Sequence, residues 1–240
     1  MDLNGKTALV TGGTDGIGAE IARQLKAKGA QVIVAGRDAG RVKAAQDAGF
    51  EAIGADLTSA EGVDALVEAL GGRAIDILVN NAGMGVEHDF REAAPDVAAA
   101  DRTIFLNLNA PIRLTAALMT MLRSRPQAAI VNVTSGLAIA PRAASPVYCA
   151  TKAGLRSYTQ ALRAQLADTN VRVIEALPPV VETRMTAARA GKKMSAGECA
   201  RQIVEGIEGK KAEVNVGLTK VLQTVNSVSP ALARRIMLRF

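Results

Sequence analysis

Seven short apolar runs alternate along the whole chain with longer, alanine-rich amphipathic stretches. Most of the runs are continuously apolar, as strands buried on both faces require, and lack the polar alternation of half-exposed strands. The pattern therefore predicts a doubly wound parallel sheet that helices cover on both faces. The predicted strands are KTALVT (6–11), QVIVAG (31–36), FEAIGA (50–55), IDILVN (75–80), AAIVNV (128–133), VRVIEAL (171–177) and AEVNVG (212–217).

Capping residues mark the ends of several predicted helices between these strands. Asp38 and Ser59 stand where N-caps belong, and Gly29, Gly49 and Gly71 stand where helices should end. These signals support the alternation of strands and helices.

The longest predicted helix runs from about Pro95 to Ser124 and ends before Pro126. Pro111 lies inside it and should kink it, because proline removes one backbone hydrogen bond and clashes with the preceding turn.

No linker, low-complexity stretch or internal repeat interrupts the pattern, so residues 1–240 are expected to form one domain. Within it we expect a lid loop at about 184–197 and a C-terminal extension at about 218–240. Three apolar residues of that extension share one predicted helix face before Pro230, namely Leu222, Val225 and Val228.

The composition argues against several classes of function. No apolar run approaches the roughly 18 residues of a membrane span, and the start of the chain lacks a signal sequence, so no transmembrane segment and a cytoplasmic location are expected. Cys149 and Cys199 are too few and too isolated for a disulfide framework or a thiolate metal site. His88 is the only histidine, so no metal is expected.

The net charge of +6 lies in the C-terminal quarter, where residues 181–240 hold 11 Lys+Arg and five Asp+Glu. Solvated helix faces, an anionic substrate and an acidic membrane surface are alternative explanations. Nucleic acid is not an expected partner, because binding sites for it usually interleave aromatic side chains and Phe240 is the only one here.

A glycine-rich turn, TGGTDGIG, follows the first predicted strand and opens a helix. Gly12, Gly16 and Gly18 at this spacing form a weak motif alone, and a tight turn without a ligand has the same pattern. Their position within a strand–helix–strand unit favours a site where backbone N–H groups and a helix N-terminus bind a pyrophosphate.

The residues after the second strand bear on the choice of dinucleotide. An acidic residue there would bind the ribose hydroxyls, whereas Gly36 and Arg37 favour the 2′-phosphate of NADP(H) over NAD(H). Asp15 and Asp38 are counter-arguments, although Asp38 also fits as the cap of the next helix.

A tyrosine and a lysine separated by three residues, Tyr148 and Lys152, share one helix face. The lysine ammonium is expected to lower the pKa of the phenol, so that the tyrosine can act as a general acid or base. Ser135 ends the fifth strand thirteen residues earlier, at the sheet edge where ligands bind, and could hold a substrate oxygen. Taken singly, an exposed tyrosine or a serine cap explains each of these residues.

Together these motifs make the chain resemble the short-chain dehydrogenase/reductase family over nearly its whole length. The resemblance rests on TGGTDGIG, NNAG (80–83), Asn107 in FLNLNAPIRL, VTSG with Ser135, and Tyr148 with Lys152. SGLAIAP, PVYCATKAG and ALPPVVET are most similar to the branch named for the oxidoreductase of lipoteichoic acid D-alanylation operons. The family has a Rossmann-like fold, so the implied strand order is 3-2-1-4-5-6-7.

The resemblance implies a role for each matched residue. Tyr148 would be the acid/base, Ser135 would hold the carbonyl, Lys152 would bind the nicotinamide ribose and tune Tyr148, and Asn107 would hold a water of a proton relay. The implied cofactor-binding residues are Gly12, Thr14, Asp15, Gly16, Ile17, Gly18, Arg37, Asp56, Leu57, Asn81, Ala82, Gly83, Tyr148, Lys152, Pro178, Val181 and Thr183.

The chain departs from the family pattern after the sixth strand, where Pro178-Pro179 replaces the usual Pro-Gly. Proline should stiffen this backbone and remove one N–H donor beside the nicotinamide. The lid that follows carries four cations, which raises the hypothesis of an anionic substrate, with a solvated loop as the alternative. These cations are Arg184, Arg189, Lys192 and Lys193.

The favoured function is therefore oxidoreduction between NADP(H) and a ketone or secondary alcohol. The alternative is a dinucleotide-binding regulator or scaffold without turnover, which would need the glycine turn but no acid/base tyrosine. The resemblance also implies a homo-oligomer, either a dimer or a tetramer. The substrate and the direction of the reaction do not follow from the motifs.

Overall fold

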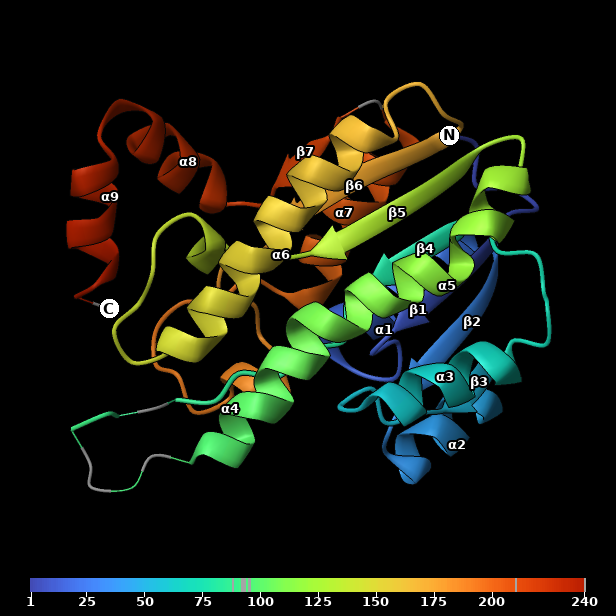
Figure 1. The fold of residues 1–240 in the computed structure, drawn as a ribbon, viewed down its shortest axis with the longest axis horizontal. Coiled ribbons are helices and arrows are strands. Elements are labelled where there is room, and N and C mark those ends of the chain that lie inside the picture. The colour runs from blue at the N-terminus through green and yellow to red at the C-terminus, as the bar shows by residue number, and fades with distance from the viewer. Residues whose placement is uncertain (88, 92–93, 95, 210, 240) are drawn as a thin grey trace.

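The computed structural model describes residues 1–87, 89–91, 94, 96–209 and 211–239. Its centre is a seven-stranded parallel sheet in the order β3-β2-β1-β4-β5-β6-β7, which confirms the predicted fold class (Figure 1). The strands are β1 (Thr7–Thr11), β2 (Gln31–Gly36), β3 (Glu51–Gly54), β4 (Ile77–Asn80), β5 (Ala128–Val133), β6 (Val171–Leu177) and β7 (Glu213–Asn215).

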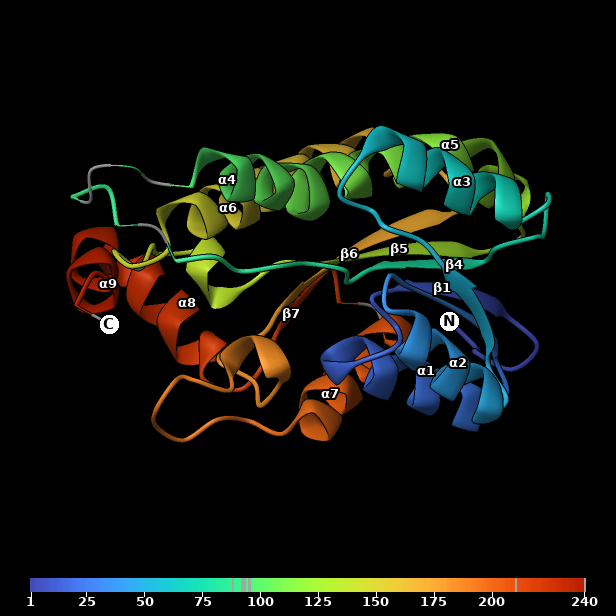
Figure 2. The ribbon, with the colours of Figure 1, turned by 90° about the horizontal axis from the view of Figure 1, so that it is seen from below.

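Helices cover both faces of the sheet, with α1, α2 and α7 on one side and α3, α5 and α6 on the other (Figure 2). Each side has its own apolar core, built largely from Val, Ile, Leu and Ala. The helices are α1 (Gly16–Ala27), α2 (Ala39–Asp47), α3 (Ala60–Ala69), α4 (Val97–Ile104), α5 (Ala110–Ser124), α6 (Pro146–Gln165), α7 (Ala196–Glu208), α8 (Thr219–Val228) and α9 (Pro230–Met237). Shorter turns are the π-helical η1 (Phe105–Asn109) and the 3-10 turns η2 (Gly136–Ala138) and η3 (Arg184–Thr186).

The burial of the strands explains why their sequences lack alternation. Every residue of β4 and β5 is buried, because helices lie above and below them. The edge strands β3 and β7 are short and partly exposed, and they lack two and three residues, respectively, at the ends of their predicted runs.

The predicted helix ends are confirmed. The side chains of Asp38 and Ser59 accept hydrogen bonds from backbone N–H groups in the first turns of α2 and α3. Gly29, Gly49 and Gly71 have φ values of 85°, 77° and 57°, a left-handed conformation that glycine adopts without strain.

The longest predicted helix is continuous from Val97 to Ser124, while Pro95 lies outside the described residues. Its irregularity is the π-turn η1, which precedes Pro111, whereas the sequence predicts a kink at that proline. By length and a mean hydropathy of 1.2 alone, this helix could cross a membrane, which the sequence analysis did not expect. Core helices meet the same criteria, and Leu114 and Leu118 pack in the core against the sheet.

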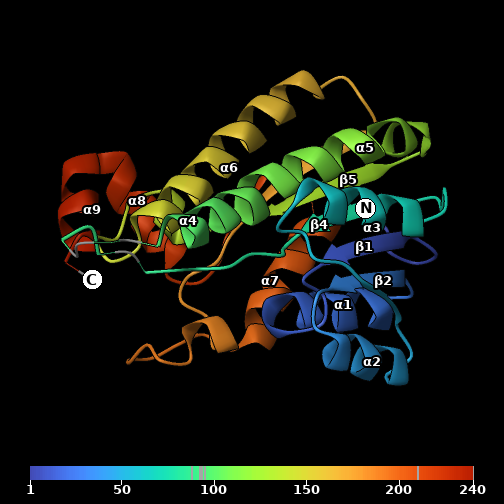
Figure 3. The same cartoon turned by 60° about the horizontal axis from the view of Figure 1, so that its bottom comes forward.

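The C-terminal extension forms α8 and α9, which lie beyond the sheet at one end of the molecule (Figure 3). The predicted helix before Pro230 is α8, Pro230 begins α9, and Leu222 packs near Gly136 of η2. Val228 is 82% exposed, so the expected apolar face is covered only in part.

Candidate active site

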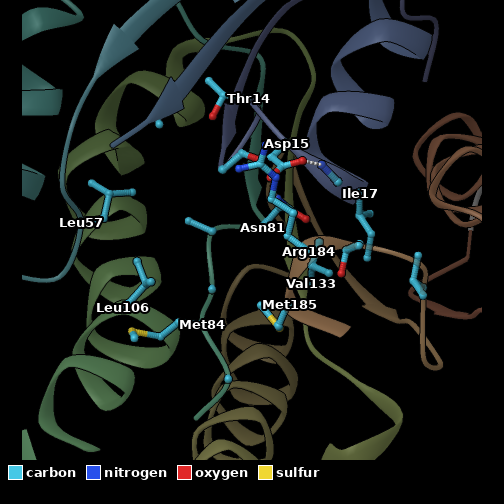
Figure 4. Close-up of a pocket in the computed structure, with 18 of the residues that line it drawn as sticks. Thr14, Asp15, Ile17, Leu57, Asn81, Met84, Leu106, Val133, Arg184 and Met185 are labelled. Atoms are coloured by element: carbon cyan, nitrogen blue, oxygen red, sulfur yellow. Dashed lines mark hydrogen bonds and ion pairs between the residues drawn. The ribbon is translucent and has the colours of Figure 1, made fainter. Parts of the chain in front are cut away.

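A cleft of about 530 Å³ opens where the carboxyl ends of the strands meet. Thr14 and Asp15 of the glycine turn lie at one end, and Met84, Leu106 and Met185 lie towards the other (Figure 4). Most of the predicted site residues line it, from segments far apart in the sequence. They are Gly12, Thr14, Asp15, Gly16, Ile17, Arg37, Asp56, Leu57, Asn81, Ala82, Gly83, Ser135, Tyr148, Lys152, Pro178, Val181 and Thr183.

The glycine turn joins β1 to α1 and forms one wall of the cleft. Gly12 and Gly16 have φ values of 62° and 55°. Gly18 does not line the cleft, because it packs beneath the turn, where an added Cβ would lie 2.3 Å from the carbonyl oxygen of Gly12. Its importance is therefore steric, while the first turn of α1 offers N–H groups and the positive end of a helix dipole to a pyrophosphate.

Hydrogen bonds between two side chains and the backbone hold this turn against the loop after β4. The Asn81 side chain donates to the carbonyl oxygens of Thr11 (3.0 Å) and Gly12 (3.3 Å). The Thr11 hydroxyl oxygen in turn accepts from the backbone N–H groups of Asn81 and Ala82, both at 3.0 Å. The sequence analysis missed Thr11, because its position at the end of a strand carries no signal of its own.

The two aspartates that argued against NADP(H) both serve as helix caps. Asp15 accepts from the Gly16 N–H at 2.8 Å, and Asp38 accepts from the Arg41 N–H at 2.9 Å. Asp38 does not line the cleft, whereas Arg37 and Arg41 do. Arg184 of the lid also approaches Asp15, at 3.4 Å.

The sequence analysis missed Arg41, which stands four residues after Arg37, in the first turn of α2. Its guanidinium lies 3.6 Å from the Asp38 carboxylate, and its buried Nε has no hydrogen-bond partner among the described residues. A buried donor without a partner is costly, so this cleft wall fits an anionic group such as a phosphate. The residues present therefore suit a nicotinamide dinucleotide, whose phosphates are anionic.

Tyr148, Ser135 and Lys152 come together on the floor of the cleft. The Ser135 hydroxyl lies near the Tyr148 phenol, whose pKa it lowers, and the Ser135 oxygen accepts from the Leu137 N–H at 3.1 Å. Ser135 is thus both the cap of η2 and a neighbour of the tyrosine. The capping role therefore does not exclude the predicted role in holding a substrate oxygen.

The expected lowering of the Tyr148 pKa is wrong. Burial raises this pKa above its ordinary value, and the Ser135 hydroxyl and the charge of Arg189 offset only part of the effect. The Lys152 ammonium lies 5.8 Å from the centre of the ring and instead donates to the Val133 carbonyl oxygen at 2.8 Å. Burial also lowers the pKa of Lys152 to about 8.

Asn107 lies behind the cleft, fully buried in η1, and does not line it. Its side chain accepts from the Met84 N–H at 2.9 Å and donates to the Met84 carbonyl oxygen at 2.8 Å. It also donates to the Thr151 hydroxyl at 3.1 Å, on the helix of Tyr148 and Lys152. Asn107 therefore joins three segments of the site, and its water-binding role stays a prediction.

The lid is tied at its base by a parallel bridge between Val181 and Met194. Thr183 and Thr186 form a capping box around η3 at its start. Pro178, of the unusual Pro-Pro pair, accepts at its carbonyl oxygen from the Gly136 N–H at 2.9 Å and so contacts the segment after Ser135.

The four lid cations do not converge on the tyrosine. Arg184 points towards Asp15 of the glycine turn, Lys193 donates to the lid carbonyls of Thr186 and Ala187, and Lys192 is exposed. Only Arg189 acts on Tyr148, whose pKa it lowers.

A metal site is not evident in this part of the molecule. Across the described ranges, no three His, Cys, Asp or Glu side chains are grouped so that they could hold an ion. Cys149 lies beside Tyr148 but is buried, and burial raises the pKa of its thiol.

Comparisons with known proteins agree with this geometry. A family profile described as short chain dehydrogenase matches residues 6–193. The "Uncharacterized oxidoreductase DltE" of Bacillus subtilis (strain 168) is 38% identical over 224 residues, or 89% of each chain.

Two solved structures share the fold. A short chain dehydrogenase from Burkholderia cenocepacia J2315, in complex with NADP, has a TM-score of 0.89, 27% identity and 99% coverage of both chains. A 3-ketoacyl-(acyl-carrier-protein) reductase from Brucella melitensis, complexed with NADH, has a TM-score of 0.77 and 30% identity, covering 84% of this chain and 90% of its own.

The family match spans more than half of the chain, and three of the four catalytic residues expected for it, Ser135, Tyr148 and Lys152, meet in one cleft. The alternative of a scaffold without turnover does not explain why an acid/base tyrosine, a serine and a buried lysine should lie together. The chain belongs to the short-chain dehydrogenase family, and it is an oxidoreductase that uses a nicotinamide cofactor.

Proposed function

We propose that this protein transfers hydride between NADP(H) and a ketone or secondary alcohol, with Tyr148 as the general acid/base. The observation that carries the proposal is that Ser135, Tyr148 and Lys152 lie together in the cleft, with the Ser135 hydroxyl near the Tyr148 phenol. The bound nicotinamide would supply or accept the hydride, and the side chains of the chain manage the proton and the substrate oxygen.

In the direction of reduction, Ser135 and Tyr148 would both donate to the carbonyl oxygen. The Ser135 oxygen already accepts from the Leu137 N–H, which leaves its own proton to donate. Tyr148 would give its proton to that oxygen as hydride reaches the carbonyl carbon. A raised pKa keeps Tyr148 protonated at neutral pH and thus supports this direction.

Lys152 and Asn107 would keep this arrangement in place. Lys152 holds the end of β5 through Val133 and puts a positive charge near the phenol, which would stabilise the phenolate after proton transfer. Asn107 fixes the loop after β4 to α6.

The preference for NADP(H) is supported by Arg37 and Arg41 and by the use of Asp38 as a cap. We expect Arg41→Gln to raise the Kd of NADPH at least tenfold, roughly the effect of one lost charge-assisted hydrogen bond, with little change for NADH. Titration of each cofactor, followed by the fluorescence of the reduced nicotinamide, measures both constants.

The matched control is Arg23→Gln, since Arg23 lies on α1, pairs with Glu20 and does not line the cleft. Equal affinity of the unmodified protein for NADH and NADPH would contradict the proposed preference.

The substrate class is proposed to include anionic carbonyl compounds. The positive charge of Arg189 lowers the pKa of Tyr148. Arg189 lies 4.0 Å and Arg142 lies 2.9 Å from the carboxylate of Glu87. These three side chains come from the lid, the loop before α6 and the loop after β4, so two positive charges face one negative charge on the tyrosine side of the site.

We expect Arg189→Gln to raise KM about tenfold for an anionic carbonyl substrate and to leave KM for a neutral analogue unchanged. Added salt should weaken only the first reaction, since it screens charges. Lys192→Gln is the control, because it removes the same charge from an exposed position of the lid. If neutral and anionic substrates responded alike to Arg189→Gln, the anionic class would be ruled out.

A further inference from the structure

A row of polar side chains crosses the apolar sheet one residue before the active-site end of β5. Asn80, Asn132, Glu175 and Glu213 are register partners on β4, β5, β6 and β7, so their side chains point to the same face. Asn80, Asn132 and Glu175 are at most 2% exposed. Such a row is unexpected in a doubly covered sheet, because each buried polar group needs a partner.

Glu175 is the charged centre of this row, and its two oxygens have different partners. Oε1 accepts from the hydroxyl of Thr134 at 2.8 Å, and Oε2 accepts from the guanidinium of Arg156 at 2.8 Å. Thr134 lines the cleft between Val133, which holds Lys152, and Ser135, which contacts Tyr148. The carboxylate therefore touches the segment that carries both catalytic contacts.

Arg156 reaches Glu175 from the helix that carries the tyrosine and the lysine. Tyr148, Lys152 and Arg156 follow one another at intervals of four residues, so they form one stripe along α6. Lys152 and Arg156 thus bind α6 to the end of β5 at successive turns, the first directly and the second through Glu175 and Thr134.

Stability is a poor explanation for this buried pair. Burial raises the pKa of Glu175 above its ordinary value even though Arg156 and Thr134 oppose the shift. Folding therefore disfavours the charged carboxylate, and an apolar pair of similar size is often as stable or more so. A geometric requirement is the better explanation.

We propose that Arg156, Glu175 and Thr134 are positioning residues that fix the end of β5 against α6, so that Ser135 and the Val133 carbonyl keep their contacts with Tyr148 and Lys152. The inference rests on the proposed role of Tyr148. It assigns no chemical step to the three residues, because among them only Thr134 lines the cleft.

The double variant Arg156→Met/Glu175→Met tests the proposal without leaving a buried charge unpaired. We expect its thermal midpoint to equal or exceed that of the unmodified protein. We also expect kcat to fall about 10- to 100-fold, as small misplacements of catalytic groups do, while KM for the cofactor is unchanged. Thr134→Val should lower kcat in the same way, and Thr134→Ser should restore it because serine keeps the hydroxyl.

A second readout needs no substrate, because the chain has two tyrosines and no tryptophan. In a Tyr158→Phe background, the alkaline change in ultraviolet absorbance reports the pKa of Tyr148 alone. The groups acting on that phenol are Ser135, Arg189, Cys149 and the nearby Lys152. The Ser135 contact and the position of Lys152, which donates to Val133, both depend on the end of β5. Both favour the phenolate, so the double variant should titrate at higher pH.

The control is Arg163→Met, which removes a charge from the same helix. Arg163 contacts β6, the segment before β7 and Glu213, and has no contact with Thr134 among the interactions of the described residues. The proposal would be overturned if the double variant had the same kcat and the same Tyr148 pKa as Arg163→Met. If the unmodified protein turned over no carbonyl or alcohol, the proposed function would fail, while the titration would still decide the positioning role.

Discussion

Tyr148→Phe is expected to lower kcat by about 10²- to 10⁴-fold, the usual contribution of a positioned general acid. The ring keeps its packing, but the substrate oxygen loses its proton donor and Ser135 loses its partner. Cofactor affinity should be nearly unchanged, because the glycine turn and the arginines of the cleft are untouched. Steady-state rates and an NADPH titration on the same preparation measure the two effects.

Tyr158→Phe is the matched control, since Tyr158 lies on the same helix and does not line the cleft. This variant should lose at most a small part of its stability and should keep its full turnover. Retention of most of the turnover by Tyr148→Phe would require another proton donor and would contradict the proposed mechanism.

The raised pKa of Tyr148 also predicts different pH profiles for the two directions. Reduction needs the protonated phenol, so this group should not limit its rate until the pH passes the usual tyrosine value of about 10. Oxidation needs the phenolate, so its rate should still be rising at that pH. Profiles of kcat in both directions on one substrate pair would show the difference.

Lys152→Met is expected to abolish most turnover while raising stability at neutral pH. Burial lowers the Lys152 pKa from 10.5 to about 8, so the folded state disfavours the ammonium. The shift corresponds to a cost on the order of 3 kcal/mol, of which the hydrogen bond to Val133 offsets about 1 kcal/mol or more. Methionine removes both contributions, which leaves a gain of about 1–2 kcal/mol.

The stability difference between Lys152→Met and the unmodified protein should depend on pH, because burial lowers the Lys152 pKa. Below pH 8 both the folded and the unfolded states carry the proton, so the full cost is present. Between about 8 and 10.5 only the unfolded state keeps it, so the unfolding free energy of the unmodified protein rises with pH. The advantage of Lys152→Met should therefore shrink across this window.

Chemical denaturation at several pH values gives these unfolding free energies. Lys152→Arg is the comparison, because it keeps a buried charge and should show no gain at neutral pH. A loss of stability in Lys152→Met at pH 7 would contradict the argument from burial.

Apolar runs and glycine spacing predicted the parallel sheet and the glycine turn, since both are local signals. The strand order and most of the cleft residues were implied only by the resemblance to the family. Gly12 and Gly16 could be assigned because a strand and a helix flank them in the sequence. Arg41 and Glu175 could not, because Arg41 matters through its place in the wall of the cleft and Glu175 through a contact across the fold with Thr134.

The direction of the Tyr148 pKa shift could not be predicted from the sequence either, for a different reason. Sequence spacing gave the distance to Lys152 along the helix, and the structure does place the two side chains near each other. Spacing carries no information about solvent, however, and the removal of water from the phenol outweighs the neighbouring charges. A pKa therefore needs the surroundings of a residue as well as its neighbours in the chain.

The π-turn η1 changes how the helix from Val97 to Ser124 should be understood. An α-helix advances by about 100° per residue, and the wider turn shifts the phase between the segments on either side. Accordingly α4 lies against α6, whereas α5 packs against α3, β4 and β5. A regular α-helix could also cover the sheet. Without the π-turn, however, the Asn107 side chain would not be directed towards both Met84 and Thr151.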